Sequence, residues 1–350
     1  MMKTQDFKLT QYSHGAGCGC KIAPDVLELI LGNSTQRGIQ FESLLVGNST
    51  NDDAAVMAID DENCLISTTD FFTPIVDDAL LFGQIAGVNA ISDVYAMGGK
   101  PLMAIAILGW PVNQLPNELA GLVVEGGRLA CARAGIPLAG GHSIDLPEPI
   151  FGLAVTGTVL KNHIKYNSSA KPGDWLYLTK PLGIGLISTA QKKNLAKSDD
   201  MDLAINSMLE LNDLGYSLAR LDYVNAMTDV TGFGLAGHLL EMCRSNNLKA
   251  LLSFDKIPVF PFVDRYIELE CQPGGTNRNL KAYGQYLMSA NNSQKMVLAD
   301  PQTSGGLLVA VANEKRKVFE DWLASNNLAF NAIGQIESNS SKESCIEVSH

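Results

Sequence analysis

The sequence predicts a two-domain protein of α/β (α+β) class. At 350 residues the chain is long for one domain and fits two domains of ordinary size. Segments typical of strands and of helices mix in both halves, and a polar stretch with a Pro-Gly pair, Lys161–Asp174, separates the halves. Because 46% of the residues are hydrophobic and only 18% are charged, both halves can bury a core.

The first half is expected to place its polar residues beside well-defined elements. Asp70 follows a predicted strand directly, and Asn89 and Asp93 lie four residues apart, on one face of a predicted helix. Gly98-Gly99 and Pro101 end that helix. The predicted elements are the strand Cys64–Thr69, the helix Ala79–Met97, the strand Leu102–Leu108, a helix near Leu115–Ala134 and the strand Ile150–Leu160.

The second half begins again with a strand after the linker. A long, mostly polar helical region is expected over roughly 186–222, and a helical pattern follows through Leu235, Leu239 and Met242. Further strands are predicted in LKALLSF, GGLLVAV and NAIGQI, with a helix near Glu314–Ala324 between the last two. We therefore expect a flexible segment over 1–20, a first domain over 21–160, a linker over 161–173 and a second domain over 174–350.

The charge and the cysteines limit the class of protein. The 26 basic and 37 acidic residues give a net charge of −11, which disfavours binding to nucleic acid or to an anionic membrane. The sequence shows neither an apolar leader nor an uninterrupted apolar run long enough for a membrane span. Its seven cysteines have no regular spacing, which favours a reducing compartment. We expect a cytoplasmic protein.

Scattered aspartates are the first candidates for a functional site. Asp52, Asp53, Asp70, Asp93 and Asp229 each lie near a turn or the end of an element. Magnesium binds through a few carboxylates together with phosphate oxygens, so these residues could hold a metal–nucleotide complex. Aspartate also favours turns and helix starts for local hydrogen bonding, and for any single one this structural explanation is the better one.

Glycine-rich turns recur along the chain. They are GAGCGC, AMGGKP, LAGGHS, PGGTNRN and TSGG. Glycine lets backbone amides approach phosphate closely, but each turn taken alone is more often only a turn. None has the Gly-Lys-Ser/Thr spacing of a P-loop, so that fold is not the first expectation.

The sequence Cys18-Gly19-Cys20-Lys21 is the third candidate. A cysteine acts as nucleophile or chalcogen carrier in its thiolate form, which Lys21 would favour. Zinc binding lacks a second cysteine pair, redox pairs usually have two residues between the cysteines, and an inert buried thiol does not fit a glycine-flanked site. His14 could be a base, a capping residue or plain loop.

Together these segments resemble the selenophosphate synthetase family. The matching pieces extend from about Leu9 to Gly334 in family order. They are LTQYSHGAGCGCK, NDDAAV, STTDFF, NAISDVYAMGGKP, AILGWP, LAGGHSID, FGLAVTG, TKPLGIG, MTDVTGFGL, PGGTNRN and DPQTSGGLL. The HGAGCGCK block is the most specific. The aspartate and glycine blocks are also similar to the wider superfamily of aminoimidazole ribonucleotide synthetase and thiamine-phosphate kinase.

The resemblance implies a fold and a reaction. The fold is the aminoimidazole-ribonucleotide-synthetase type, in which the N-terminal half forms a barrel-like interface in a homodimer. The reaction converts ATP, selenide and water to selenophosphate, AMP and phosphate, with magnesium as cofactor. Its product supplies activated selenium for selenocysteine and selenouridine synthesis. ATP, selenide, a second copy of the chain and a selenium-delivery protein are the implied partners.

The resemblance also implies roles for individual residues. Cys18 would be catalytic, assisted by Lys21. Magnesium would be held by Asp53, Asp93 and Asp229. Contacts to ATP or its metal would come from Lys21, Thr50, Asn51, Asp52, Asp70 and Asp93. Gly141, His142 and Ser143 would reach the nucleotide from the partner subunit.

Two other functions compete with this one. A different ATP-dependent kinase or synthetase of the same superfamily would keep the aspartates but leave HGAGCGCK without a purpose. A selenium or metal carrier that uses Cys18 and Cys20 would need no complete set of aspartates. A selenide requirement for ATP turnover distinguishes these possibilities.

Overall fold

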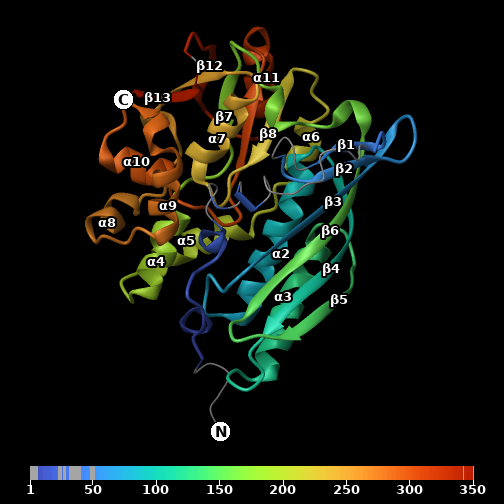
Figure 1. Cartoon of the computed structure of the whole chain (residues 1–350), viewed down its shortest axis with the longest axis vertical. Helices are drawn as coiled ribbons and strands as arrows, with labels where there is room; N and C mark the ends of the chain where they lie inside the picture. Colours follow the sequence, from blue (N-terminus) through green and yellow to red (C-terminus); the bar gives the residue numbers. More distant parts are fainter. Residues whose placement is uncertain are drawn as a thin grey trace.

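The chain builds two mixed β-sheets, one in each half (Figure 1). The computed structural model describes residues 7–22, 26, 29–30, 41–47, 52–341 and 343–349. Within these residues the first sheet has six strands and the second has seven. The last strand of the first sheet along the chain ends at Leu160, and the first strand of the second sheet begins at Trp175.

The first sheet has the spatial order β1-β2-β3-β6-β4-β5. All neighbours are antiparallel except β4 and β5, which are parallel. The strands are β1 (Leu44–Val46), β2 (Ala55–Ala58), β3 (Asn63–Phe72), β4 (Lys100–Trp110), β5 (Leu138–Asp145) and β6 (Ile150–Leu160). β5 forms the outer edge, and most of its residues are exposed.

Helices α2 (Ala79–Ala96) and α3 (Asn117–Arg133) cover one face of this sheet. α2 contacts β3 and β6 on one side and α5, α6 and β8 on the other, so it lies between the two halves. It has the length and composition of a membrane span, but 78% of it is buried inside the protein. It is therefore a core helix.

The second sheet has the spatial order β10-β13-β9-β12-β7-β11-β8. β13 runs parallel to β9 and β10, and the other neighbours are antiparallel. The strands are β7 (Trp175–Leu178), β8 (Val224–Asp229), β9 (Leu248–Ser253), β10 (Leu287–Met288), β11 (Leu307–Val311), β12 (Ala332–Ser338) and β13 (Cys345–Ser349).

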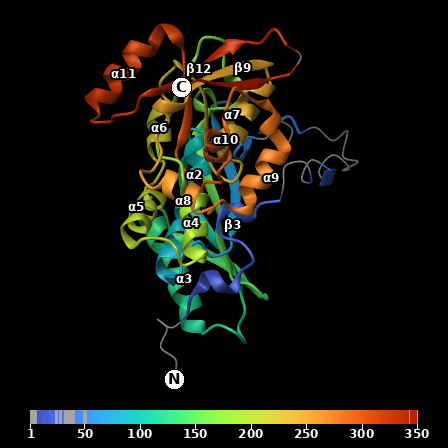
Figure 2. The ribbon, with the colours of Figure 1, turned by 90° about the vertical axis from the view of Figure 1, so that its left-hand side faces the viewer.

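Both faces of strand β11, the neighbour of the edge strand β8, are covered, and its five residues are all buried. On one face Val309 packs with Phe319 of α11, which lies on the outer side of the molecule in Figure 2. On the other face Leu308 joins the large core that runs through both halves. The helices of this half are α4 (Ile184–Lys192), α5 (Ser198–Leu209), α6 (Leu214–Leu218), α7 (Gly234–Arg244), α8 (Val263–Glu268), α9 (Gly274–Tyr283), α10 (Asn292–Leu298) and α11 (Arg316–Ser325).

Most predicted elements are confirmed, and two of the differences involve glycine-rich segments. The predicted helical region over 186–222 is three helices, α4, α5 and α6. LAGGHSID is an edge strand, and PGGTNRN begins helix α9, although both were expected to be turns. Asp70 lies inside β3, two residues before its end. Glycine permits many conformations, so its presence alone does not distinguish a turn from the edge of an ordered element.

The contact between α2 and α3 depends on glycine. A Cβ atom added at Gly126 would lie 2.2 Å from the carbonyl oxygen of Leu80 and 2.7 Å from the backbone nitrogen of Gln84. Both obstacles are backbone atoms of α2, so no side-chain rotation relieves the clash. The helices can approach this closely only because Gly126 has no side chain.

We expect Gly126→Ala to lower the free energy of unfolding by about 1–3 kcal/mol, the usual cost of overpacking a core. Gly121→Ala on the same helix is the matched control, because a Cβ there meets nothing within 4 Å. It should stabilise the protein by roughly 0.5–1 kcal/mol, since alanine favours the helix. Chemical denaturation measures both changes. Equal effects in the two variants would contradict the close contact at Gly126.

Candidate active site

The segment that carries Cys18 lies between the two halves of the molecule. Gly17 forms a β-bridge with Thr73, which follows β3 in the first half. The backbone N–H of Cys18 donates to Thr303 Oγ1 of the second half, at 3.0 Å. Gly17 has φ of +51°, and a Cβ there would lie 2.4 Å from Thr303 Oγ1. This position therefore requires glycine.

Cys18 is buried, with 1% of its surface exposed, and begins the short 3₁₀ helix Cys18–Cys20. Its Sγ atom lies 3.4 Å from Asn89 Oδ1. Burial raises the pKa of the Cys18 thiol, and Asp70 and Asp229 raise it further against the opposing effect of Lys21. The glycines around Cys18 predict that this segment is mobile. In the structure, however, the Cys18 thiol is buried in the core.

Asn89 connects three parts of the site from its place on α2. Its Oδ1 atom faces Cys18 and also accepts from the backbone N–H of Ser304, at 2.8 Å. Its Nδ2 atom donates to Asp70 Oδ2 at 2.5 Å. The whole residue is buried, so each of these bonds replaces a contact with water. Asn89 therefore fixes the thiol, a carboxylate and the Thr303-Ser304 turn relative to one another.

Lys21 and Asp70 form an ion pair beside the thiol. Lys21 Nζ lies 3.1 Å from Asp70 Oδ1. Burial acts to lower the pKa of Lys21, but Asp70, Cys18 and Asp93 together raise it above its ordinary value. Lys21 is therefore a cation held among acidic groups.

Three further carboxylates lie between the two halves of the molecule: Asp93 and Asp229 are buried, and Asp53 is half-buried. Asp93 accepts from Thr68 Oγ1 at 2.5 Å, and Asp53 accepts from Thr228 Oγ1 at 2.8 Å. Asp229 accepts from Ser92 Oγ at 2.6 Å, and this bond joins β8 to α2. Each carboxylate thus has a hydroxyl partner, and they come from both halves of the chain.

The electrostatics of these carboxylates suit a cation. Burial raises the pKa of Asp53 and of Asp93 well above the usual range, and the neighbouring Asp229 raises both further. Burial also raises the pKa of Asp229 to about 6, against a hydrogen bond from Ser92 and the charge of Lys21. Asp53 Oδ2 is buried and has no hydrogen-bond partner in the described part of the chain. Mutually repelling carboxylates with an unpartnered oxygen fit a divalent cation.

Among the described residues, no three His, Cys, Asp or Glu side chains form a complete metal cage. Magnesium that binds with a nucleotide usually takes only one or two carboxylates and fills the other positions with phosphate oxygens and water. The residues present therefore fit a metal–nucleotide complex better than a metal bound by protein alone. Asp229 does not cap the following helix, because α7 begins at Gly234 after Phe233 and has no side-chain cap.

The remaining predicted residues fall into three groups. Asp52 lies at the boundary and accepts from the backbone N–H of Asn167 at 2.8 Å. Thr50, Asn51 and the side chain of Cys20 lie outside the described residues. Gly141, His142 and Ser143 are exposed on the edge strand β5, which β6 and β4 separate from the strand β3 that carries Asp70.

Several residues of the site were missed by sequence reasoning. Asn89 was noted only for sharing a helix face with Asp93, and Thr303 only as part of a glycine-rich turn. Lys180 is buried and donates to the backbone oxygens of Glu210 (2.7 Å) and Ser304 (3.0 Å). Burial lowers the pKa of Lys180 to about 8, against the attraction of Glu210 and Asp229. Asn89, Thr303 and Lys180 all lie in sequence motifs that match the family, and this membership is the signal that could have identified them.

The fold has counterparts in known proteins. Models of the AIR synthase related protein, N-terminal and C-terminal domains, match residues 51–159 and 171–344. The thiamine-monophosphate kinase from Stenotrophomonas maltophilia superposes with a TM-score of 0.64 at 18% identity, covering 92% of this chain and 95% of that one. The hydrogenase maturation protein HypE in complex with ATP gives 0.61 at 17% identity, covering 98% and 95%. The chain is thus an AIR synthase related protein.

Sequence relatives define the family more narrowly. The selenide, water dikinase of Shewanella baltica (strain OS155) is 56% identical over 333 residues, which cover 95% of this chain and 94% of the relative. The selenide, water dikinase of Shewanella sp. (strain MR-4) is 56% identical over 330 residues, which cover 94% of each chain. This chain belongs to the selenide, water dikinase family.

Asn89→Ala tests how firmly the site is held together. The variant leaves the buried backbone N–H of Ser304 without its acceptor and frees Cys18 and Asp70. We expect the free energy of unfolding to fall by about 1–3 kcal/mol, and iodoacetamide to alkylate Cys18 faster. Asn326→Ala is the control, because Asn326 makes an exposed hydrogen bond to Trp322. An alkylation rate equal to that of the control would show that Asn89 does not hold the thiol.

Proposed function

We propose that the boundary site makes selenophosphate from selenide, ATP and water, with release of AMP and phosphate. The observation that carries this proposal is the placement of Cys18 and Lys21 against buried carboxylates from both halves of the chain. A thiol and a lysine beside a cation-binding pocket suit transfer of a phosphoryl group to a chalcogen anion. The 56% identity to relatives named selenide, water dikinase supports the same reaction.

Asp53, Asp93 and Asp229 would hold Mg²⁺ in this proposal. The ion would supply positive charge that offsets the charge of the triphosphate. The side chains that position these carboxylates are Thr228, Thr68 and Ser92, through the hydroxyl bonds described above.

Charge neutralisation is the main chemical task, because an anionic acceptor must approach an anionic phosphate. Lys21 supplies a permanent cation next to Cys18. Asp70 accepts from Asn89 and pairs with Lys21, so it positions the ammonium group. The site also excludes water well, since Cys18, Asn89 and Asp229 are nearly inaccessible. Exclusion of water favours transfer to selenide over simple hydrolysis of ATP.

Lys21, Thr50, Asn51, Asp52, Asp70 and Asp93 are proposed to contact ATP or its metal. Cys18 is proposed as the catalytic residue. The six cysteines whose side chains are described are free thiols, which suits a reducing compartment such as the cytoplasm.

Phosphorus NMR of purified variants tests the reaction and the role of Cys18. Cys18→Ser should abolish selenophosphate formation, because a serine hydroxyl is a much weaker acid and nucleophile than a cysteine thiol. Cys20→Ser is the matched control, two residues away, and should keep substantial activity. Active Cys18→Ser beside inactive Cys20→Ser would reverse the assignment. A wild-type protein that turns over ATP equally well without selenide would favour another kinase of the superfamily.

A second copy of the chain is the proposed partner. In Figure 1 α2 and α3 cover one side of the first sheet, and the described helices leave the other side open. That open face carries exposed apolar side chains on neighbouring strands, among them Met57, Phe71, Met103 and Ile105. An apolar face of this kind is typical of an interface. Pairing there would also place Gly141, His142 and Ser143 of the edge strand near the other subunit.

Ile105→Glu should dissociate the dimer, because it buries a charge in the proposed interface. Leu195→Glu is the control, since Leu195 is 45% exposed, close to the 46% of Ile105, but lies in the second half. Sedimentation velocity measures both. If the unmodified protein is a monomer with full activity, both the interface and the role of Gly141–Ser143 in the neighbouring site are wrong.

A further inference from the structure

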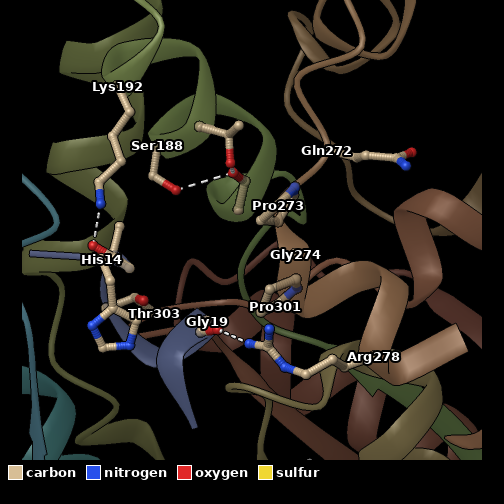
Figure 3. A pocket seen from close by; sticks show the side chains of 15 residues that line it. His14, Gly19, Ser188, Lys192, Gln272, Pro273, Gly274, Arg278, Pro301 and Thr303 are labelled. Atoms are coloured by element: carbon tan, nitrogen blue, oxygen red, sulfur yellow. Dashed lines mark hydrogen bonds between the residues drawn. The ribbon is translucent and has the colours of Figure 1, made fainter. Parts of the chain in front are cut away.

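Two adjoining cavities lead from the surface to Cys18. The outer one has a volume of about 310 Å³ and lies between the glycine-rich segment, α4 and the start of α9 (Figure 3). The inner one has about 10 Å³ and touches Cys18 and Lys21. Gly19, Gly275 and Arg278 line both cavities, so the two meet at these residues. A volume near 10 Å³ is about the lower limit for one water molecule, so the inner cavity is a constriction in front of Cys18 that must widen before a larger ion passes.

The charge around the outer cavity is opposite in sign to that of the whole protein. Of the described residues that line it, Lys192 and Arg278 are cationic, His14 pairs with Glu148, and none of the lining residues is Asp or Glu. Lys21 lines the inner cavity, where its charge is paired with Asp70. The whole chain has a net charge of −11, so this local surplus of positive charge stands out from the rest of the protein. Positive charge around a small cavity favours a small anion.

Arg278 marks the junction of the cavities. Its Nη2 atom donates to the backbone oxygen of Gly19 at 2.5 Å, and Figure 3 shows this bond beside Pro301. A Cβ added at Gly275 would lie 2.8 Å from Pro301 Cγ and 3.3 Å from the backbone oxygen of Gly19. The junction therefore stays open only with glycine at 275. A guanidinium group with several donors can hold Gly19 and still bind an anion.

The carboxylates stand apart from this route. Asp53, Asp70, Asp93 and Asp229 line neither cavity, whereas Cys18 and Lys21 line the inner one. The thiol thus contacts Asn89, which holds Asp70, and also lines the inner cavity, with Lys21 between that cavity and Asp70. In phosphoryl transfer the acceptor and the leaving group lie roughly in line on opposite sides of the phosphorus. A separate route for the acceptor satisfies this requirement.

We propose that these cavities are the entry route of the acceptor, the hydroselenide monoanion HSe⁻, and that Arg278 and Lys192 bind it on the way to Cys18. This inference rests on the proposed function and specifies how its anionic substrate arrives. Lys192 lies on α4 and donates to the backbone oxygens of Ser13 and Gly15, so it borders the outer cavity beside the glycine-rich segment. The nucleotide with its metal would enter from the side of the carboxylates.

Steady-state kinetics test the route with selenide as substrate. Arg278→Gln should raise KM for selenide by about tenfold, the loss expected for one hydrogen bond to a charged group. kcat and KM for ATP should stay close to the wild-type values, and Arg278→Lys should recover part of the affinity. Lys192→Gln is a second variant on the opposite wall and should act in the same direction. Arg128→Gln controls for net charge, because Arg128 is exposed on α3, outside both cavities, and pairs with Glu125. Unchanged KM for selenide in both cavity variants would overturn the route.

Bromide provides a readout that does not depend on turnover, because it has the charge and nearly the size of HSe⁻. Anomalous diffraction from bromide-soaked wild-type crystals should show an ion near Arg278, and this ion should be absent in Arg278→Gln. Bromide should also inhibit the enzyme in competition with selenide.

Bound bromide without competition would be an adventitious ion only and would count against the route. Competition by orthophosphate but not by bromide would assign the cavity to a product instead. If the wild type makes no selenophosphate but still binds bromide there, the proposed reaction fails and the anion site stands.

Discussion

The buried carboxamide of Asn89 holds together parts of the chain that are far apart in sequence. One oxygen faces the Cys18 thiol and accepts from Ser304, and the amide nitrogen donates to Asp70. Neither an aspartate nor a leucine of similar size could do this, because the position needs a donor and an acceptor on one short side chain. The N-terminal segment, β3 and the turn before β11 therefore meet at a single point on α2.

Helix α2 can serve as this fixed point because it is one of the most tightly held elements of the fold. Its contact with α3 is close enough to require glycine at 126, and its polar residues are held on both sides of the boundary. Ser92 donates to Asp229 of the second half, and Asp93 accepts from Thr68 of the first. Residues 89, 92 and 93 lie on one helical face, so a single rigid helix sets the spacing of the thiol and two carboxylates.

Sequence reasoning found the elements that have a clear period and the residues that are chemically distinctive. The predicted strand Ile150–Leu160 is confirmed, and the helix predicted over Ala79–Met97 is α2. The spacing of Asn89 and Asp93 correctly indicates that they share a face of this helix. Thr303 could not be found in this way, because its contact with Cys18 spans 285 positions and depends on tertiary packing. The same packing buries Cys18, although its glycine neighbours indicate exposure. Glycine at 274 and 275 suggested a turn, yet these residues open α9, where the absence of side chains leaves room for the cavities.

The site also shows how an acidic protein handles substrates that are all anions. Burial raises the pKa of Asp53, Asp93 and Asp229, and neighbouring carboxylates raise it further, so these groups favour a bound cation. A cation bound there lets the triphosphate approach an otherwise repulsive surface. A second anion cannot be attracted by the same bound cation, because the nucleotide already compensates the positive charge of that cation. It needs positive charge from another source, and the chain supplies this with Lys192 and Arg278 at the outer cavity. Cys18 thus lies between the carboxylates, which need a bound cation to accept the triphosphate, and the basic residues of the cavities. At this position the triphosphate and the anionic acceptor can approach each other with the least electrostatic repulsion.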